Sequence, residues 1–221
     1  MAFDLSIFNP GARPLMGLDV SSSAVKLVEL SRTAKGEHRI ERYATENLPR
    51  DSVVDGNIAK LDDVADAVRR AWRRMGTSTR NVALALPAAA VITKKIIVPA
   101  NQREQELEVL VESEANQYIP FQLDEVNLDF QVVGPAPGSP DEVEVLIAAS
   151  RKEKVEDRVA VAEAAGLRAV VVDVESYAAQ AAFELVERQL PDGQRDTNIV
   201  LVEYGANMMN DIIVLIDQLV N

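Results

Sequence analysis

The stretch LMGLDVSSSAVKLVEL, residues 15–30, constrains the fold more than any other part of the sequence. Apolar residues alternate along its first arm, which carries Asp19, and a second apolar arm carries Lys26. Two such arms joined by small polar residues predict a β-hairpin. The predicted turn consists of Ser21, Ser22 and Ser23.

The hairpin turn has two interpretations. Small residues let backbone N–H groups approach an anion, the Asp19 carboxylate can hold a hydrated divalent metal ion, and Lys26 can contact phosphate oxygens. The alternative is a solvated turn with a lysine at the strand edge, because short motifs often match by chance. The residues alone leave both interpretations open.

Composition excludes several classes of function. The net charge of −12 argues against non-specific binding to nucleic acid or to an anionic membrane, both of which need clustered Lys and Arg. The chain has no cysteine, so it has no disulfide and no thiolate site. His38 is the one histidine, and its polar surroundings predict a surface residue rather than a triad member.

Two features of the sequence predict a cytoplasmic location. No apolar run reaches the roughly 18 to 20 residues of a membrane span. The opening residues, MAFDLSIFNPG, lack the basic and apolar regions of a secretory signal. We therefore expect a cytoplasmic protein without direct membrane insertion.

Strand and helix patterns alternate after the hairpin, which predicts an α/β fold. A third strand is expected over 37–47, a polar loop over 49–57, and a buried strand over 81–86. Between them, apolar residues recur every three or four positions and predict a helix that ends at Gly76. The apolar positions of that helix are Leu61, Val64, Ala65, Val68, Ala71, Trp72 and Met75.

Residues 91–149 are expected to form a small subdomain of their own. A strand over 91–98 precedes a helix whose start we place at a capping box of Asn101 and Glu104. Two further strands, over 126–133 and 142–149, flank the loop GPAPGSPD. The acidic row of the helix is interpreted as a solvated face, with partner binding as the alternative: Glu104, Glu108, Glu112 and Glu114.

The chain then resumes its α/β alternation. Ser150 and Glu153 predict a second capping box, for a helix that stops at Gly166. A β-branched strand follows over 167–172, and a helix with a stripe of small residues follows that strand.

The hairpin GLDVSSSAVKLVEL resembles the first phosphate-loop hairpin of actin-like ATPases, and the stretch from Phe8 to Ser31 is similar to the opening of the PilM family of that superfamily. The resemblance implies an actin-like (ribonuclease H-like) first half with an inserted small α+β subdomain. It assigns residues 1–86 and 150–198 to subdomain 1A, 87–149 to an SHS2-like insert, and 199–221 to the start of a second half.

The same resemblance implies a nucleotide site. Asp19, the three serines and Lys26 correspond to the phosphate loop, with Asp19 as the magnesium ligand. Glu175 corresponds to an acid that positions the attacking water, which suits a carboxylate at a helix start. The alternative for Glu175 is an acid that serves the helix dipole alone.

The second phosphate loop is expected at Glu203 and Gly205. The family has an aspartate and hydroxyl residues there, whereas this chain has glutamate, Asn207 and methionines. These changes weaken a site for magnesium and phosphate. ATP and Mg²⁺ are the cofactors of the family, and we expect weak or absent ATP affinity and negligible turnover in this chain.

The resemblance covers roughly residues 3 to 206, so we expect the second half of an actin-like protein to be truncated. Residues 199–220 are then expected to leave an apolar segment that favours self-association.

Two functions follow as expectations. The first is a scaffold of the type IV pilus assembly platform, which binds the cytoplasmic N-terminal peptide of PilN in a groove between the main and inserted subdomains and so lies at the inner membrane. The second is an actin-like ATP-binding protein or ATPase that uses residues 19–26 and Glu175. A third, an unrelated α/β domain, remains because fold alone does not fix function.

Overall fold

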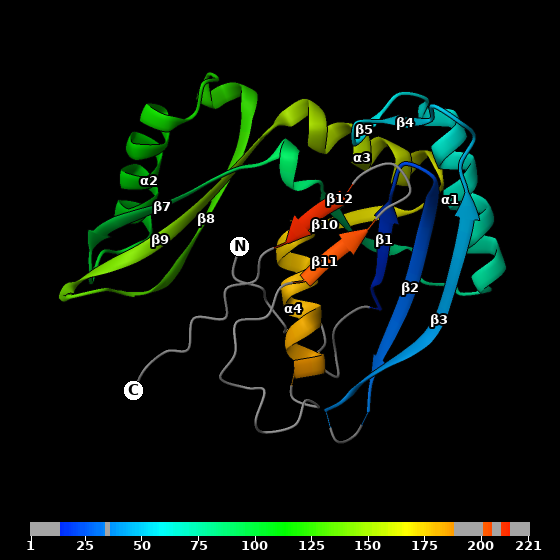
Figure 1. Ribbon diagram of the computed structural model, residues 1–221, viewed down its shortest axis with the longest axis horizontal. Coiled ribbons are helices and arrows are strands. Elements are labelled where there is room, and N and C mark those ends of the chain that lie inside the picture. The colour runs from blue at the N-terminus through cyan, green and yellow to red at the C-terminus, as the bar shows by residue number, and fades with distance from the viewer. Residues whose placement is uncertain (1–13, 34–35, 188–200, 205–208, 213–221) are drawn as a thin grey trace. The chain divides into compact units, whose positions relative to one another are not determined.

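The computed structural model describes residues 14–33, 36–187, 201–204 and 209–212 (Figure 1). The described chain forms two compact units, one made of residues 14–87 together with those from 158 onward, and one made of residues 88–157. Each unit combines strands and helices. The predicted α/β class is confirmed.

The first unit is built on a sheet whose described strands lie in the order β10-β6-β1-β2-β3. Strands β1, β6 and β10 run parallel to one another, and β2 runs antiparallel to both β1 and β3. The parallel strands therefore share one edge of the sheet at their carboxyl ends. The strand bounds are β1 (Met16–Val20), β2 (Ala24–Arg32), β3 (His38–Asn47), β6 (Asn81–Leu86) and β10 (Arg168–Val174).

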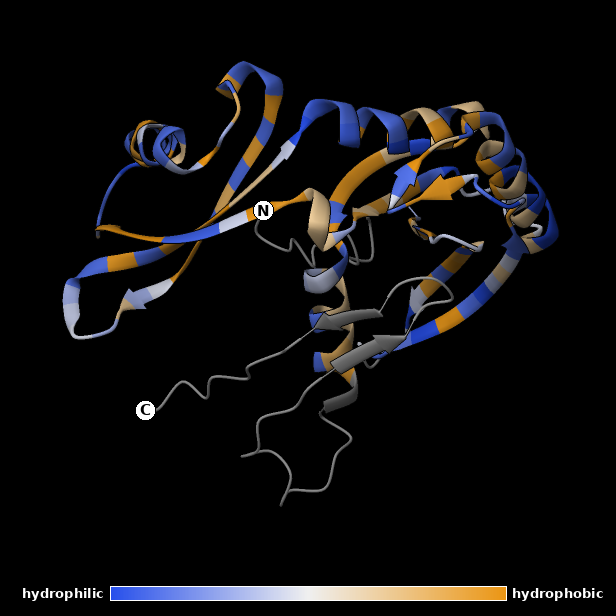
Figure 2. Ribbon diagram, turned by 45° about the horizontal axis from the view of Figure 1, so that its top comes forward, coloured by the Kyte–Doolittle hydropathy of each residue, from blue (hydrophilic) through white to orange (hydrophobic). Residues whose placement is uncertain are grey.

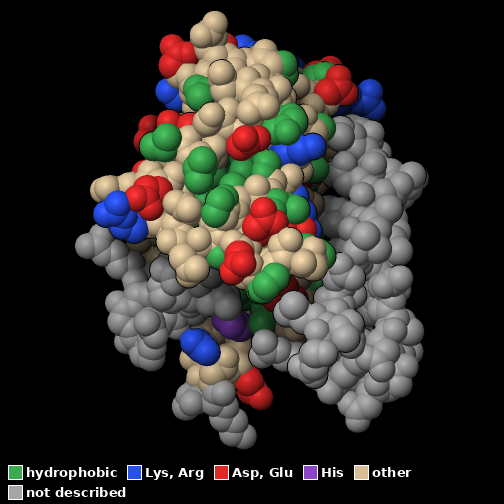
Figure 3. Space-filling view, turned by 90° about the vertical axis from the view of Figure 1, so that its left-hand side faces the viewer, with side chains coloured by type: hydrophobic (Ala, Val, Ile, Leu, Met, Phe, Trp, Pro, Cys, Tyr) green, Lys and Arg blue, Asp and Glu red, His purple; other side chains and the backbone are tan. Residues whose placement is uncertain are grey.

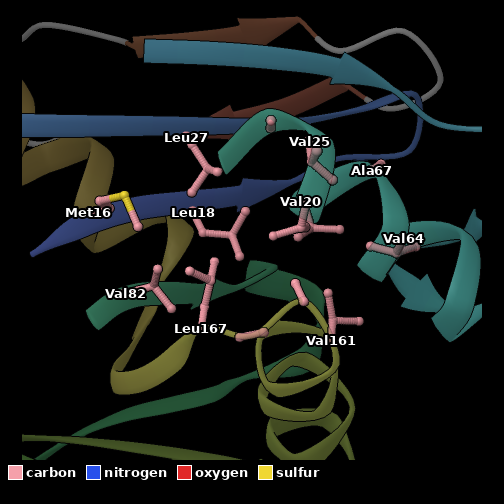
Figure 4. Close-up of a cluster of buried hydrophobic side chains, with 14 of the residues drawn as sticks. Met16, Leu18, Val20, Val25, Leu27, Val64, Ala67, Val82, Val161 and Leu167 are labelled. Carbon is pink, nitrogen blue, oxygen red and sulfur yellow. The ribbon is translucent and has the colours of Figure 1, made fainter. Parts of the chain in front are cut away.

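Helices α1 (Leu61–Met75), α3 (Lys152–Ala164) and α4 (Glu175–Glu187) complete this unit, although α3 begins in the other one. Helix α1 ends as predicted at Gly76, whose φ of 63° is the left-handed conformation that glycine adopts without strain. Apolar side chains from the sheet, α1 and α3 point toward one another in a single core (Figure 4). Its fully buried members include Met16, Val25, Leu27, Val64, Val68, Val82 and Val161.

The segment predicted as a polar loop contains a small hairpin. Strands β4 (Val53–Val54) and β5 (Asn57–Ile58) pair across a turn in which Asp55 and Gly56 have positive φ. A second two-stranded pair, β11 (Leu201–Tyr204) and β12 (Met209–Ile212), forms a separate antiparallel ribbon.

The 88–157 unit is a three-stranded antiparallel sheet, in the order β7-β9-β8, with one helix on it. Figure 2 shows hydrophobic and hydrophilic residues alternating along its long strands, as expected where one face is buried. Val111, Val145 and Ile147 lie at the centre of its core. The bounds are η2 (Ala88–Ala90), β7 (Ile92–Pro99), α2 (Glu104–Tyr118), η3 (Leu123–Glu125), β8 (Val126–Ala136) and β9 (Ser139–Arg151).

Three local predictions for this unit are wrong. Helix α2 begins after Arg103, whose backbone N–H donates to the Glu106 carboxylate at 3.1 Å, whereas Asn101 has a positive φ of 62° and lies before the helix. The proline-rich loop is shorter than predicted, since β8 and β9 extend to a turn at Gly138. Ser150 does not cap α3. It lies in β9, one residue before the strand ends, and its hydroxyl donates to the Ala90 carbonyl at 2.8 Å.

The described part of the chain contains no helix that is long and apolar enough to cross a membrane. On the face shown in Figure 3, hydrophobic side chains reach the surface between acidic and basic ones. The assignment of residues 87–149 to an SHS2-like insert stays a prediction.

Candidate functional site

The β1–β2 hairpin pairs the two charged residues of the predicted phosphate loop. Asp19 lies directly opposite Lys26 in the antiparallel ladder, and Lys26 Nζ donates to Asp19 Oδ2 at 2.8 Å. The two side chains are 43% and 50% exposed, so solvent weakens their attraction. A phosphate or a metal ion at this turn would have to compete with the ion pair.

Some polar groups of the serine turn already form hydrogen bonds within the protein. The backbone N–H and the hydroxyl of Ser21 both donate to the Ala24 carbonyl, each at 3.0 Å. The carbonyl of Ser23 accepts from the Leu48 N–H at 2.8 Å, which ties the turn to the chain that follows β3. An anion at this turn would therefore draw on Ser22 and Ser23 rather than on Ser21.

The carboxyl edge of the parallel strands brings acids from distant parts of the sequence together. Leu18 on β1 is level with Leu84 on β6, and Asp173 on β10 is level with Ala85. Asp19 is thus on the same level and the same face as Asp173, with one strand between them. Two strand spacings separate their backbones by about 9.6 Å.

Asp173 is the residue of this edge that the sequence analysis did not select. Burial raises the pKa of its carboxyl, and a hydrogen bond from the Val174 N–H at 2.6 Å opposes that shift in part. Its signal in the sequence is a single acid at the end of a β-branched run. At such a position the carboxylate is poorly solvated, which raises the free energy of its charged form.

Glu175 begins helix α4, two residues beyond Asp173. The helix N-terminus stabilises its negative charge. Among the described residues the structure therefore places Asp19, Lys26 and Glu175 at one edge of one sheet. Their assigned roles in catalysis and nucleotide binding stay predictions.

A buried arginine fixes the middle strand of this edge. Arg158 of α3 is 3% exposed, and its Nε donates to the Ala85 carbonyl at 2.8 Å. Its Nη2 donates to the Gly56 carbonyl in the β4–β5 turn at 3.1 Å. Arg158 therefore holds the end of β6 between Asp19 and Asp173. The sequence analysis missed this role of Arg158, because an arginine inside a helix has no signal that separates it from a surface residue.

The second phosphate loop does not join this edge through strand pairing. Glu203 lies on β11, where its backbone pairs with that of Asn210 on β12. Gly205 lies outside the described residues. The described residues also contain no group of three or more His, Cys, Asp or Glu side chains arranged to hold a metal ion. Magnesium bound with a nucleotide needs one or two carboxylates, so Asp19 remains the residue here that fits the role.

A shallow, open hollow of about 450 Å³ lies elsewhere, on the 88–157 unit. It is lined by α2 and by the segment that includes η3, with Val109, Glu112 and Asp124 on its walls. Glu112 belongs to the acidic row noted in the sequence, whereas none of the residues assigned to the predicted nucleotide site lines the hollow.

Comparison with known proteins places these features in a family. Residues 17–220 match the family described as Type IV pilus assembly protein PilM. A solved structure described as the PilM-PilN type IV pilus biogenesis complex is 30% identical to the chain with a TM-score of 0.70; the match covers 85% of this chain and 53% of that one. The chain thus spans about half the length of that relative.

Two more distant structures are also similar. One is the cytoplasmic domain of EpsL, an inner-membrane component of the type II secretion system of Vibrio cholerae, with 11% identity, a TM-score of 0.48 and coverage of 75% of this chain and 58% of that one. The other is a Bacteroides thetaiotaomicron protein with an actin-like ATPase fold and unknown function, with 9% identity, a TM-score of 0.40 and coverage of 88% and 62%.

Proposed function

We propose that this chain, which belongs to the PilM family of type IV pilus assembly proteins, is a scaffold that binds the N-terminal peptide of a PilN-type protein. One observation carries the proposal: the chain matches, over 85% of its length and at 30% identity, a structure described as the PilM-PilN complex. Binding of this kind would hold the chain at the inner membrane through its partner.

The 88–157 unit offers a surface that suits an extended peptide. One face of its sheet packs on α2, and Ile97 and Leu146 lie on the other face, where Ile97 is 56% exposed. Lys95 and Glu144, 3.5 Å apart, lie beside them on that face. Apolar anchors with charged neighbours are the features that recognise an extended peptide by its alternate side chains.

Titration of the chain with a synthetic peptide of the PilN N-terminal segment tests this function. We expect saturable binding in the micromolar range, about −8 kcal/mol. Ile97→Asp should weaken binding at least about tenfold, whereas Val109→Asp, on the exposed side of α2, should not. A peptide that fails to saturate the unmodified chain would rule out the scaffold function.

Weak nucleotide binding is the second candidate, and the shared edge of Asp19, Lys26 and Glu175 favours it. Lys26 would contact phosphate oxygens and Asp19 would hold the hydrated magnesium that accompanies the nucleotide. Glu175 would orient a water at the helix start. The Asp19–Lys26 ion pair has to open for this, which predicts a low affinity.

Calorimetry with ATP and Mg²⁺ separates the two candidates. We expect a dissociation constant for ATP of about 1 mM or higher, which corresponds to a binding free energy of about −4 kcal/mol or weaker. Lys26→Met should abolish the remaining signal, and Arg103→Met, in the other unit, should leave it unchanged. Stoichiometric binding at micromolar ATP would instead make nucleotide binding the leading function.

A further inference from the structure

Strand β3 carries two large hydrophobic side chains that are mostly exposed to solvent. Tyr43 is 75% exposed and Ile40 is 62% exposed. Scattered exposed hydrophobic residues are normal, but these two lie on the same strand, at the border of the sheet.

A bulge places both side chains on one face. Tyr43 lies opposite Val28 and Ile40 lies opposite Leu30, with an irregularity in the register between them. Val28 and Leu30 are two residues apart and share a face, so Ile40 and Tyr43 share it as well. Without the extra residue of the bulge, positions three apart would point to opposite faces.

The backbone of β3 is open along most of its outer side, although the Thr45 carbonyl accepts from Arg74 of α1 at 3.0 Å. In the described sheet, β2 is its hydrogen-bonded neighbour, and its other edge faces none of the described strands. Such an edge presents N–H and C=O groups that a further strand can pair with. The occupant is therefore an extended strand with hydrophobic side chains at matching positions.

We propose that two copies of this chain pair antiparallel through β3, about a twofold axis between Glu41 and Arg42. Each Ile40 then lies opposite Tyr43 of the second copy, and each Glu41 lies opposite Arg42 of the second copy. Arg42 already donates to Glu29 at 3.0 Å, and its side chain remains 49% exposed with further N–H donors available. Glu41 already accepts from Ser31 and Arg39, in each case through Oε1, so its Oε2 is the atom that would accept from Arg42 of the second copy.

The register of this pairing is specified by the same residues. Moving the axis by one residue, to lie between Arg42 and Tyr43, places Ile40 opposite Thr45 and Arg42 opposite Tyr43. That arrangement loses both the hydrophobic pairs and the opposite charges. A single pair of strands buries less than a standard interface of about 1,600 Å², so we expect a weak dimer, with a dissociation constant of about 0.1 mM.

Charge complementation at the two exposed positions tests the pairing. Sedimentation equilibrium of the unmodified chain, from about 1 µM to about 1 mM, should show a monomer–dimer equilibrium. Ile40→Lys and Tyr43→Glu should each weaken self-association at least tenfold. An equimolar mixture of the two variants should dimerise again, because lysine at 40 then faces glutamate at 43 while the other pair stays native.

Matched controls keep the outcome decisive. Val170→Lys, on the opposite border strand β10, should dimerise like the unmodified chain, and circular dichroism should show all variants folded. A monomer throughout the concentration range, unchanged association of either variant, or no recovery in the mixture would each overturn the proposal. None of these outcomes depends on PilN or on nucleotide.

Discussion

Asp19 and Asp173 stand at the same level of one sheet, on strands separated by β6, yet their environments differ. Asp19 is close to half exposed and forms an ion pair with Lys26. Asp173 is desolvated, and no salt bridge joins it to another residue of the described ranges. Burial of a carboxyl is a cost to folding that a functional site can retain.

Asp173→Asn is expected to stabilise the chain at neutral pH. Because the pKa of Asp173 is raised from its ordinary 3.8, the folded state binds the proton more tightly, and stability falls as pH rises from 3.8 through the folded pKa. The variant should gain roughly 0.5 kcal/mol or more at pH 7 and nothing below pH 3.8. Urea denaturation over this pH range measures the difference; a variant less stable than the parent at pH 7 would contradict it.

Glu29→Gln is expected to have the opposite effect. Burial by itself raises the pKa of Glu29, but hydrogen bonds from Thr79 (2.6 Å), Arg42 and Thr77 (both 3.0 Å) outweigh it, so the pKa lies below its ordinary 4.5. Glu29 therefore contributes stability that is present above pH 4.5 and is lost as pH falls through the folded pKa.

The expected loss for Glu29→Gln is about 1 to 3 kcal/mol at pH 7, since the amide leaves buried donors poorly satisfied. Denaturation at pH 7 and at pH 3 measures it, and the loss should shrink at the lower pH. Glu104→Gln, on an exposed position of α2, is the control and should change stability by less than about 0.5 kcal/mol.

The Asp19–Lys26 ion pair is expected to contribute little to stability. A double-mutant cycle with Asp19→Asn and Lys26→Met should give a coupling energy below about 1 kcal/mol, because both groups are exposed. The coupling energy should fall further in 1 M salt, where the Debye screening length is only about 3 Å. A coupling of several kcal/mol would show that the pair is part of the fold rather than available for a ligand.

The two hydrophobic cores are expected to respond separately to truncation. Val111→Ala in the 88–157 unit and Val64→Ala in the other unit each remove a fully buried side chain and should cost about 1 to 3 kcal/mol. Hydrogen exchange should place the loss of protection within 88–157 for Val111→Ala and outside it for Val64→Ala. Equal loss in both units for either variant would contradict independent cores.

The strongly periodic elements were predictable from sequence. The β1–β2 hairpin, helix α1 with its end at Gly76, and the separate 88–157 sheet follow from alternation, helical spacing and a glycine stop. The small β4–β5 hairpin was not, since strands of two residues are too short to show a period.

The site was predictable in part, for physical reasons. Asp19 and Lys26 are joined by a hairpin, so local sequence places them together. Asp173 and Arg158 come to the same edge through strand order and helix packing, which depend on contacts across the whole unit. The capping error at Ser150 has a similar cause, because strand pairing in β9 outweighed the local preference for a cap.

The division of the chain at residues 87/88 and 157/158 has a consequence for how such a protein is assembled in evolution and in the laboratory. The described part of the smaller unit is the single stretch 88–157 with its own core, so one exchange of sequence replaces all of that part. The boundary at 157/158 falls inside α3, directly before Arg158, so a grafted unit would have to continue the helix that carries Arg158 to the Asp19 edge.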